Sequence, residues 1–307
     1  MGTHARAGLV AVLAIGVLLT VIRLGQDGSA TTPPKGPYVA LGDSYTAGPK
    51  IPGQTGKPAG CDRSDRNYPA LVAQKLNLTA DGFRDVSCSG ATTADLSAPQ
   101  STGNGVNRAQ FSALSGRTRL VTLGIGGNDI GFSSLITQCV KRGVLYLATG
   151  GDTYSSDDAP CKAQNTSGGT DHVRDRIQAA GQRLARALGE IRRRSPQARV
   201  YVVGYPAILP SGTTGCGREL ALAPGDVSFL REKEQQLNDM LRRQAQAAGA
   251  GYVDTYAPSA DRDACSAADT RWIEPLIPLA PAAPVHPDAR GERGMADAVL
   301  SAIGVKV

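Results

Sequence analysis

A serine and a histidine are the residues of this sequence whose positions most favour nucleophilic chemistry. Ser44 follows Gly42 and Asp43 directly after a short apolar run, so its hydroxyl lies where a predicted strand gives way to a loop. His286 stands before Pro287 near the end of the chain and offers an imidazole as a general base. A serine hydroxyl activated by an imidazole can attack a carbonyl and form a covalent acyl intermediate.

Two further segments follow predicted strands and could supply hydrogen-bond donors. Gly90 lies after one strand, and Asn128 lies after another within Gly126-Gly127-Asn128-Asp129. Acyl transfer needs donors aimed at the developing oxyanion; a glycine lets a backbone N–H approach closely, and an asparagine adds an amide donor. Gly90 and Asn128 fit these roles. The alternative for the Gly-Gly-Asn-Asp segment is a tight turn followed by a helix cap.

Short apolar runs bounded by Gly or Pro predict the elements that position these residues. Each run is too short for a helix and reads as a buried parallel strand. Helical patterns lie between them, which favours a three-layer α/β/α sandwich with a mostly parallel, five-stranded sheet. Such sheets bind ligands at the carboxyl ends of their strands. The expected strands are Tyr38–Leu41, Phe83–Val86, Leu120–Ile125, Arg199–Val203 and Gly251–Val253.

The clearest helix carries apolar residues three or four positions apart, which stacks them on one face. Further helices are expected over about Val227–Ala248 and Pro287–Ile303. Two stretches, Leu135–Gly169 and Leu209–Pro224, fit no regular element and are expected as disulfide-tied excursions on the rim of the site. The stacked residues are Val173, Ile177, Ala180, Leu184, Leu188 and Ile191.

Length and composition indicate one exported domain. The chain has 307 residues, 41% of them hydrophobic, and its net charge of +6 is scattered, which does not indicate a nucleic-acid-binding arm. Gly8–Ile22 lacks charges and follows His4 and Arg6; it is shorter than the roughly 20 residues that span a bilayer. We expect residues 1–30 to be a signal peptide, or else an uncleaved membrane anchor, residues 31–37 to be a linker, and residues 38–307 to be the domain.

The cysteine content agrees with an oxidising compartment outside the cytoplasm. An even number permits complete pairing, and six cysteines allow fifteen connectivities. Sequential pairing closes short loops and is the expectation: 61–88, 139–161 and 216–265. The sequence has no C-x-x-C pair and only three histidines, so we expect no metal site. The cysteines are Cys61, Cys88, Cys139, Cys161, Cys216 and Cys265.

The four segments around Ser44, Gly90, Asn128 and His286 resemble, in order, the four blocks of the SGNH, or GDSL-type, hydrolases. The resemblance spans Tyr38 to Ile303, and with its six cysteines the chain is most similar to secreted actinobacterial lipases and phospholipases. It implies a flavodoxin-like fold, Ser44 as nucleophile and His286 as base. It also implies an oxyanion hole formed by the Ser44 and Gly90 N–H groups and the Asn128 side chain, with no cofactor.

One position departs from the pattern of this superfamily. An Asp usually stands three residues before the His, and here Ala283 occupies that position. A triad Asp fixes the tautomer and orientation of the imidazole, a task that a backbone carbonyl can also perform. We therefore expect a Ser-His dyad with the carbonyl of Ala283 as acceptor. Asp254 and Glu274 are the alternative carboxylates, and His172 is expected to have a capping or surface role.

The expected substrate is a lipid or phospholipid acyl ester. The apolar stretches Ile130–Leu147 and Leu276–Val285 would suit an acyl chain, and the alternative for both is a packed rim of the site. We expect a secreted monomer with weak contact to membrane surfaces. The alternative enzyme is a carbohydrate acetyl esterase, which would prefer acetyl over long-chain esters. The alternative of another class is a catalytically inactive binding module.

Overall fold

A parallel β-sheet forms the middle layer of the protein, whose computed structural model describes residues 33–34, 36–148, 158–212 and 216–306. Its strands are hydrogen-bonded in the order β2-β1-β5-β6-β7, and all four pairs are parallel. The central strands β1 and β5 are buried along their whole length, which explains their continuous apolar sequence. Each expected run forms a strand: β1 (Tyr38–Gly42), β2 (Phe83–Asp85), β5 (Leu120–Gly124), β6 (Arg199–Val203) and β7 (Gly251–Val253).

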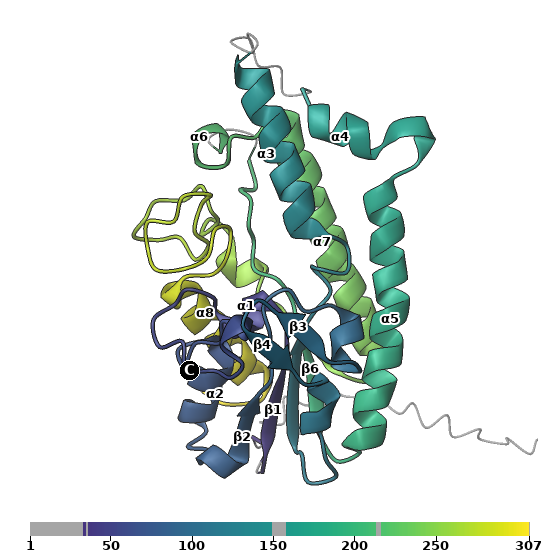
Figure 1. Cartoon of the computed structure of the whole chain (residues 1–307), viewed down its shortest axis with the longest axis vertical. Helices are drawn as coiled ribbons and strands as arrows, with labels where there is room; N and C mark the ends of the chain where they lie inside the picture. Colours follow the sequence, from purple (N-terminus) through teal and green to yellow (C-terminus); the bar gives the residue numbers. More distant parts are fainter. Residues whose placement is uncertain (1–32, 35, 149–157, 213–215, 307) are drawn as a thin grey trace, which may run out of the picture. The chain divides into compact units, whose positions relative to one another are not determined.

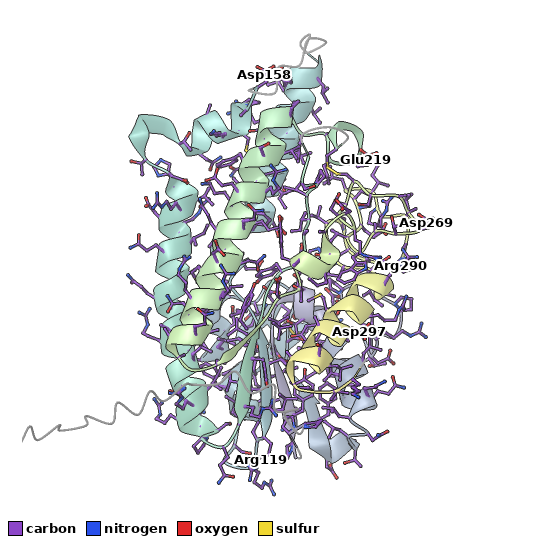
Figure 2. The ribbon with its side chains drawn as sticks, turned by 180° about the vertical axis from the view of Figure 1, so that it is seen from behind. Arg119, Asp158, Glu219, Asp269, Arg290 and Asp297 are labelled. Carbon is purple, nitrogen blue, oxygen red and sulfur yellow. A yellow bond between two sulfur atoms is a disulfide. The ribbon has the colours of Figure 1, made fainter. Side chains whose placement is uncertain are left out.

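Helices cover both faces of this sheet (Figures 1 and 2). Alternate residues of β1 point to opposite sides, as the pleat requires. Val39 packs into the core cluster on the side of α5 (His172–Arg194) and α7 (Pro224–Ala247). Tyr38 packs into the cluster with α2 (Tyr68–Lys75) and α8 (Ala289–Ala302). The expected three-layer α/β/α sandwich is confirmed.

The long amphipathic helix is α5, and all six of its predicted apolar positions are buried. The helix α7 begins at Pro224, three residues earlier than expected, because a proline is well accommodated in the first turn of a helix. The helix α8 begins two residues later than expected. Asp288 caps it by accepting the N–H groups of Arg290 and Gly291, which fixes the start.

The stretch 135–169 differs from the expectation of an irregular excursion. Most of it belongs to α3 (Phe132–Ala148) and α4 (Pro160–Asn165), and α3 carries buried residues at helical spacing. The stretch 209–224 contains the short helix α6 (Gly217–Leu220). The remaining elements are α1 (Ser44–Ala47), the hairpin of β3 (Gln100–Thr102) and β4 (Gly105–Asn107), and 3₁₀ turns at Ala59–Cys61, Ala80–Gly82, Thr93–Leu96, Gln110–Ala113, Ser167–Gly169 and Ala257–Ser259.

Three disulfides join distant loops and helices. The pairs are Cys61–Cys88, Cys139–Cys161 and Cys216–Cys265, the same three that sequential pairing predicts. The second ties α3 to α4. The expected leader at 1–30 and part of the expected linker lie outside the described residues. In the part of the chain that is described, no helix combines the length and apolar character needed to cross a bilayer.

Candidate active site

Ser44 is the first residue of α1 and lies at the carboxyl end of β1. The Asp43 carboxylate caps this short helix by accepting the Tyr45 N–H at 3.0 Å. Only a glycine fits at position 42, because a Cβ there would lie 2.2 Å from the Thr46 hydroxyl oxygen. The strand therefore runs directly into the helix and leaves the Ser44 side chain half-buried at the edge of the sheet.

His286 lies beside Ser44 although the two are 242 residues apart in sequence. The His286 Nε2 atom is 2.8 Å from Ser44 Oγ. Its Nδ1 atom is 2.7 Å from the backbone carbonyl of Pro284, which corrects the expected contact with Ala283. The Ala283 carbonyl instead accepts the backbone N–H of His286 in a tight turn, and this leaves the Pro284 carbonyl facing the ring.

The backbone of the histidine loop is strained and held from two sides. Val285 has a φ of +59°, a left-handed conformation that is costly for a β-branched residue. Its N–H donates to the Glu274 carbonyl at 3.0 Å, and its own carbonyl accepts the Tyr45 hydroxyl at 2.6 Å. The Tyr45 ring also packs against His286, with 4.8 Å between ring centroids. These contacts fix the direction of the imidazole.

The charge state of the imidazole is set by its surroundings. Burial lowers the pKa of His286, and the hydrogen bond with the Pro284 carbonyl raises it by less. The net lowering favours the neutral ring, the form that can accept a proton from a hydroxyl.

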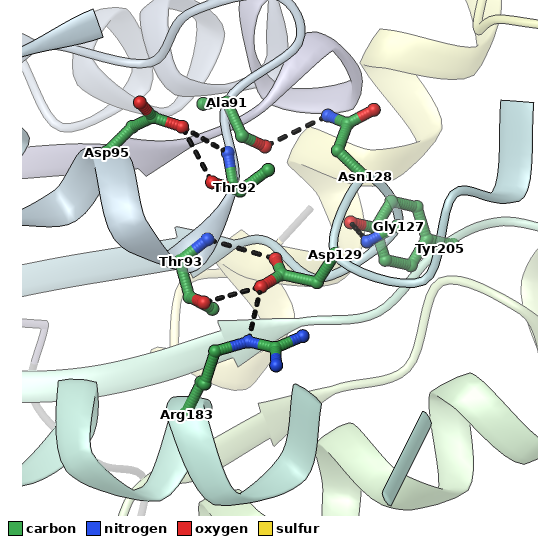
Figure 3. A network of polar contacts seen from close by, with 9 residues as sticks. All are labelled: Ala91, Thr92, Thr93, Asp95, Gly127, Asn128, Asp129, Arg183 and Tyr205. Atoms are coloured by element: carbon green, nitrogen blue, oxygen red, sulfur yellow. Dashed lines mark hydrogen bonds and ion pairs between the residues drawn. The ribbon is translucent and has the colours of Figure 1, made fainter. Parts of the chain in front are cut away.

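Three polar donors lie on the segments that follow β1, β2 and β5, and Asn128 lines the same pocket as Ser44. Within the described residues, the backbone N–H groups of Ser44 and Gly90 have no hydrogen-bond acceptor. Gly90 has a φ of +79°, which a glycine adopts without steric cost, and its neighbour Ser89 is held by the Cys61 carbonyl. Asn128 Nδ2 donates to the Ala91 carbonyl at 2.9 Å, as Figure 3 shows. One of its two amide hydrogens remains for another acceptor.

The loops that carry Gly90 and Asn128 are joined by a buried carboxylate (Figure 3). Asp129 accepts the Thr93 N–H at 2.9 Å and the Thr93 hydroxyl at 2.5 Å. Its Oδ1 atom also lies 2.9 Å from Arg183 Nε on α5. This network locks the loop after β2 to the loop after β5, so the two donors keep a fixed separation.

Tyr205 links the Ser44 loop to the Asn128 loop, a role that the sequence did not reveal. Its hydroxyl donates to Asp43 Oδ2 at 2.5 Å and accepts the Gly127 N–H at 2.8 Å. Tyr205 follows β6 by two residues, so its place at a strand end was the available signal. Burial raises the pKa of Asp43 to about 7, and the Tyr205 hydrogen bond opposes that rise.

An apolar pocket of about 160 Å³ opens on Ser44 and His286. The helix α3 contributes Phe132 and Ile136, which lie in one of the apolar stretches expected to suit an acyl chain. The other stretch contributes Leu276 and Val285. The remaining lining residues are Asp43, Tyr45, Gly127, Asn128, Ser133, Thr137, Tyr205, Ile208, Glu234, Leu237 and Pro284.

The alternative titratable residues have other partners. Asp254 accepts the N–H groups of Tyr256 and Ala257, and Glu274 Oε2 accepts those of Leu279 and Ala280. His172 is exposed at the start of α5 and does not line the pocket. In the described part of the chain, no cluster of three or more His, Cys, Asp or Glu side chains could hold a metal ion.

Comparisons with known proteins place this arrangement among ester hydrolases. Residues 40–293 match the GDSL-like Lipase/Acylhydrolase family. The chain is 41% identical to Lipase 2 of Streptomyces coelicolor, covering 87% of this chain and 86% of that protein. It is 31% identical to an esterase of Streptomyces scabiei, with 84% and 81% covered. The crystal structure of phospholipase A1 from Streptomyces albidoflavus superposes with a TM-score of 0.69 at 28% identity, covering 87% of this chain and 99% of that one.

Proposed function

Because this chain belongs to the GDSL-like lipase/acylhydrolase family and is a carboxylic ester hydrolase, we propose that it cleaves lipid acyl esters through an acyl-enzyme on Ser44. His286 acts as the general base. The observation that carries the proposal is the 2.8 Å contact between Ser44 Oγ and His286 Nε2 at the mouth of an apolar pocket.

The first half of the reaction forms the acyl-enzyme. His286 Nε2 accepts the Ser44 proton while Oγ attacks the ester carbonyl carbon. His286 Nδ1–H donates to the Pro284 carbonyl, which selects the tautomer with a free Nε2 lone pair. The imidazolium then returns the proton to the departing alcohol. In the second half, water repeats the attack on the acyl-enzyme, and Ser44 leaves with the proton.

The tetrahedral intermediate places a negative charge on the former carbonyl oxygen. We assign its stabilisation to the Ser44 N–H, the Gly90 N–H and the second amide hydrogen of Asn128. The two backbone donors have no competing acceptor in the described residues, which supports this assignment. Donors that are already oriented need no reorganisation as the charge develops, and each contributes roughly 3 kcal/mol of transition-state stabilisation.

A Ser-His dyad suffices for this chemistry. The task of a third residue is to orient the imidazole and to stabilise its charged form. The Pro284 carbonyl faces Nδ1, and Tyr45 fixes the loop and packs on the ring. Asp254 and Glu274 bind backbone N–H groups of their own loops, which supports a dyad without a carboxylate.

The pocket favours a lipid acyl chain over an acetyl group. Its wall is mostly aliphatic and aromatic, and apolar surface gains about 25 cal/mol for each Å² removed from water, so each added methylene strengthens binding. Ile277 and Leu279 follow the lining residue Leu276 and are 80% and 71% exposed. We assign to these two residues a weak contact with the lipid surface that presents the substrate.

The proposed localisation of the enzyme is outside the cytoplasm. Its three disulfides persist in oxidising surroundings, and Cys61–Cys88 lies beside the Gly90 loop that the proposed chemistry uses. A reducing compartment would therefore weaken the site itself.

Hydrolysis of p-nitrophenyl esters from acetyl to palmitoyl tests the proposal, with Ser44→Ala as the matched control. We expect turnover to rise with chain length and to vanish in the control. A maximum at acetyl would favour a carbohydrate acetyl esterase. Absence of turnover on every ester, together with failure of a fluorophosphonate to label Ser44, would favour a binding module.

A further inference from the structure

Glu234 is a buried carboxyl group in the wall of the active-site pocket. It lies on α7, its residue is 1% exposed, and it lines the pocket together with Leu237 on the same helix. The Oε1 atom accepts the backbone N–H of Ile208 at 3.0 Å. The Oε2 atom has no hydrogen-bond partner among the described residues.

An unpaired oxygen in this place is costly to the free enzyme. A buried polar atom without a partner has lost its hydration and gained no hydrogen bond in return, which destabilises the folded protein. Glu292 also has a buried, unpaired oxygen, but it belongs to the opposite face of the sheet, where its other oxygen accepts the Tyr68 N–H. Of the buried side chains with such an atom in the described ranges, Glu234 is the one that lines the pocket.

The surroundings favour the neutral form of this carboxyl group. Burial raises the pKa of Glu234 well above its ordinary value. The hydrogen bond from the Ile208 N–H opposes that rise, and the nearby charge of Asp263 adds to it. Among the described residues, no lysine or arginine lines the pocket to stabilise an anion. In the neutral acid, the oxygen that accepts the Ile208 N–H is the carbonyl oxygen, so Oε2 carries the proton and is a donor.

We infer that Glu234 selects esters whose pocket-bound part carries an oxygen acceptor, such as an ether, a hydroxyl or a second ester group, by donating a hydrogen bond to it from Oε2. This inference rests on the proposed function and adds the substrate class to it. The apolar walls around Glu234 still accept the hydrocarbon on either side of that oxygen. A site built to hydrogen-bond a substrate atom rejects the analogue that lacks it, because its own polar group then remains unpaired.

The test compares p-nitrophenyl octanoate with chains of equal length in which an ether oxygen replaces one methylene at successive positions. Each kcat/KM is divided by the rate of hydroxide-catalysed hydrolysis, which removes differences in intrinsic reactivity. We expect one oxygen position to stand out in the wild type. At that position, the corrected kcat/KM of the ether ester is divided by that of the octanoate. This ratio should be roughly tenfold higher in the wild type than in Glu234→Leu, equivalent to about 1.4 kcal/mol.

Glu234→Gln is the matched control, since its amide can still accept the Ile208 N–H and donate from the second position. It should retain most of the preference. Equal ratios in the wild type and Glu234→Leu would overturn the inference. A flat position profile in the wild type would overturn it even where Glu234→Leu does not fold. Failure of the wild type to hydrolyse any ester would contradict the proposed function and this inference together.

Discussion

The Tyr205 hydroxyl donates a 2.5 Å hydrogen bond to the Asp43 carboxylate, the residue that precedes Ser44. The same hydroxyl accepts the Gly127 N–H, one residue before Asn128. One phenol therefore sets the distance between the loop of the proposed nucleophile and the loop of a proposed oxyanion donor. Such positioning matters because misplacement of a reacting group by about 1 Å can cost 10²-fold in rate.

The first prediction concerns the removal of this phenol. Tyr205→Phe should lower kcat by about tenfold or more with little change in KM, because both loops lose their common partner while the pocket wall remains. Tyr256→Phe is the control, since its hydroxyl pairs with Gln235 on the exposed surface. Steady-state kinetics on a p-nitrophenyl ester measure the effect. Equal kcat values for the two variants would exclude a positioning role for Tyr205.

The second prediction concerns the ionisation of Asp43. Burial raises the pKa of Asp43 from 3.8 to about 7 in the folded protein. The folded state thus binds this proton more tightly than the unfolded state, and the stabilisation is complete below pH 4 and lost as the pH rises toward 7. Three pKa units correspond to about 4 kcal/mol.

Urea unfolding of the wild type and Asp43→Asn from pH 4 to pH 8 measures this effect. The stability of the wild type should fall relative to that of the variant up to about pH 7 and then level off. The exposed Asp269, labelled in Figure 2, provides the control Asp269→Asn. A wild-type stability that rises relative to Asp43→Asn over this interval would contradict the sign of the shift.

Much of the site could be predicted from the sequence because several of its residues follow the parallel strands of one sheet. Parallel strands buried on both faces appear as apolar runs, and their carboxyl ends must meet at one edge. That reasoning brought Ser44, Gly90 and Asn128 to the same edge, as the structure has them. His286 could be added only through its order relative to the other three segments.

The residues that sequence reasoning missed depend on three-dimensional detail. The carbonyl that faces His286 Nδ1 is that of Pro284 rather than Ala283, in a turn where Val285 has a left-handed φ. A valine in the sequence gives no sign of this conformation. The sequence analysis assigned no role to Tyr205 or Glu234, because the groups that they bind, the Asp43 carboxyl and the Ile208 N–H, lie far away in sequence. The spacing of apolar residues predicts which face of a helix or strand is buried. It does not predict which buried polar atoms form hydrogen bonds with one another, and these roles depend on such hydrogen bonds.

The third prediction concerns the base. The proposed mechanism needs a neutral His286, and burial lowers the pKa of this imidazole. We therefore expect kcat/KM to rise with pH through a midpoint below the ordinary histidine value of about 6.5. The pH profile of Asp43→Asn should have the same midpoint. This result would show that the midpoint does not come from the titration of Asp43 near pH 7. A midpoint above 6.5 in both proteins would show that another group controls the reaction.

The fourth prediction tests the dyad. Asp254 is exposed and caps the turn at Tyr256 and Ala257. Asp254→Ala should therefore change kcat by less than about threefold, whereas removal of a true triad Asp lowers kcat by about 10⁴. Thermal unfolding of the variant checks that the fold is intact. Loss of turnover in a folded Asp254→Ala protein would replace the dyad with a triad.

The last prediction concerns the lipid surface. Ile277 and Leu279 lie on the loop that Glu274 holds through the Leu279 N–H, and both project apolar side chains into solvent. Covering such side chains with lipid is worth about 1.5–3 kcal/mol each. The double variant Ile277→Ser, Leu279→Ser should lose at least tenfold in activity on phospholipid vesicles while hydrolysing a soluble p-nitrophenyl butyrate at the wild-type rate. Val106→Ser, which removes an exposed apolar side chain from β4, is the control. An equal loss on vesicles and on the soluble ester would mean that the loop shapes the pocket rather than contacts the lipid.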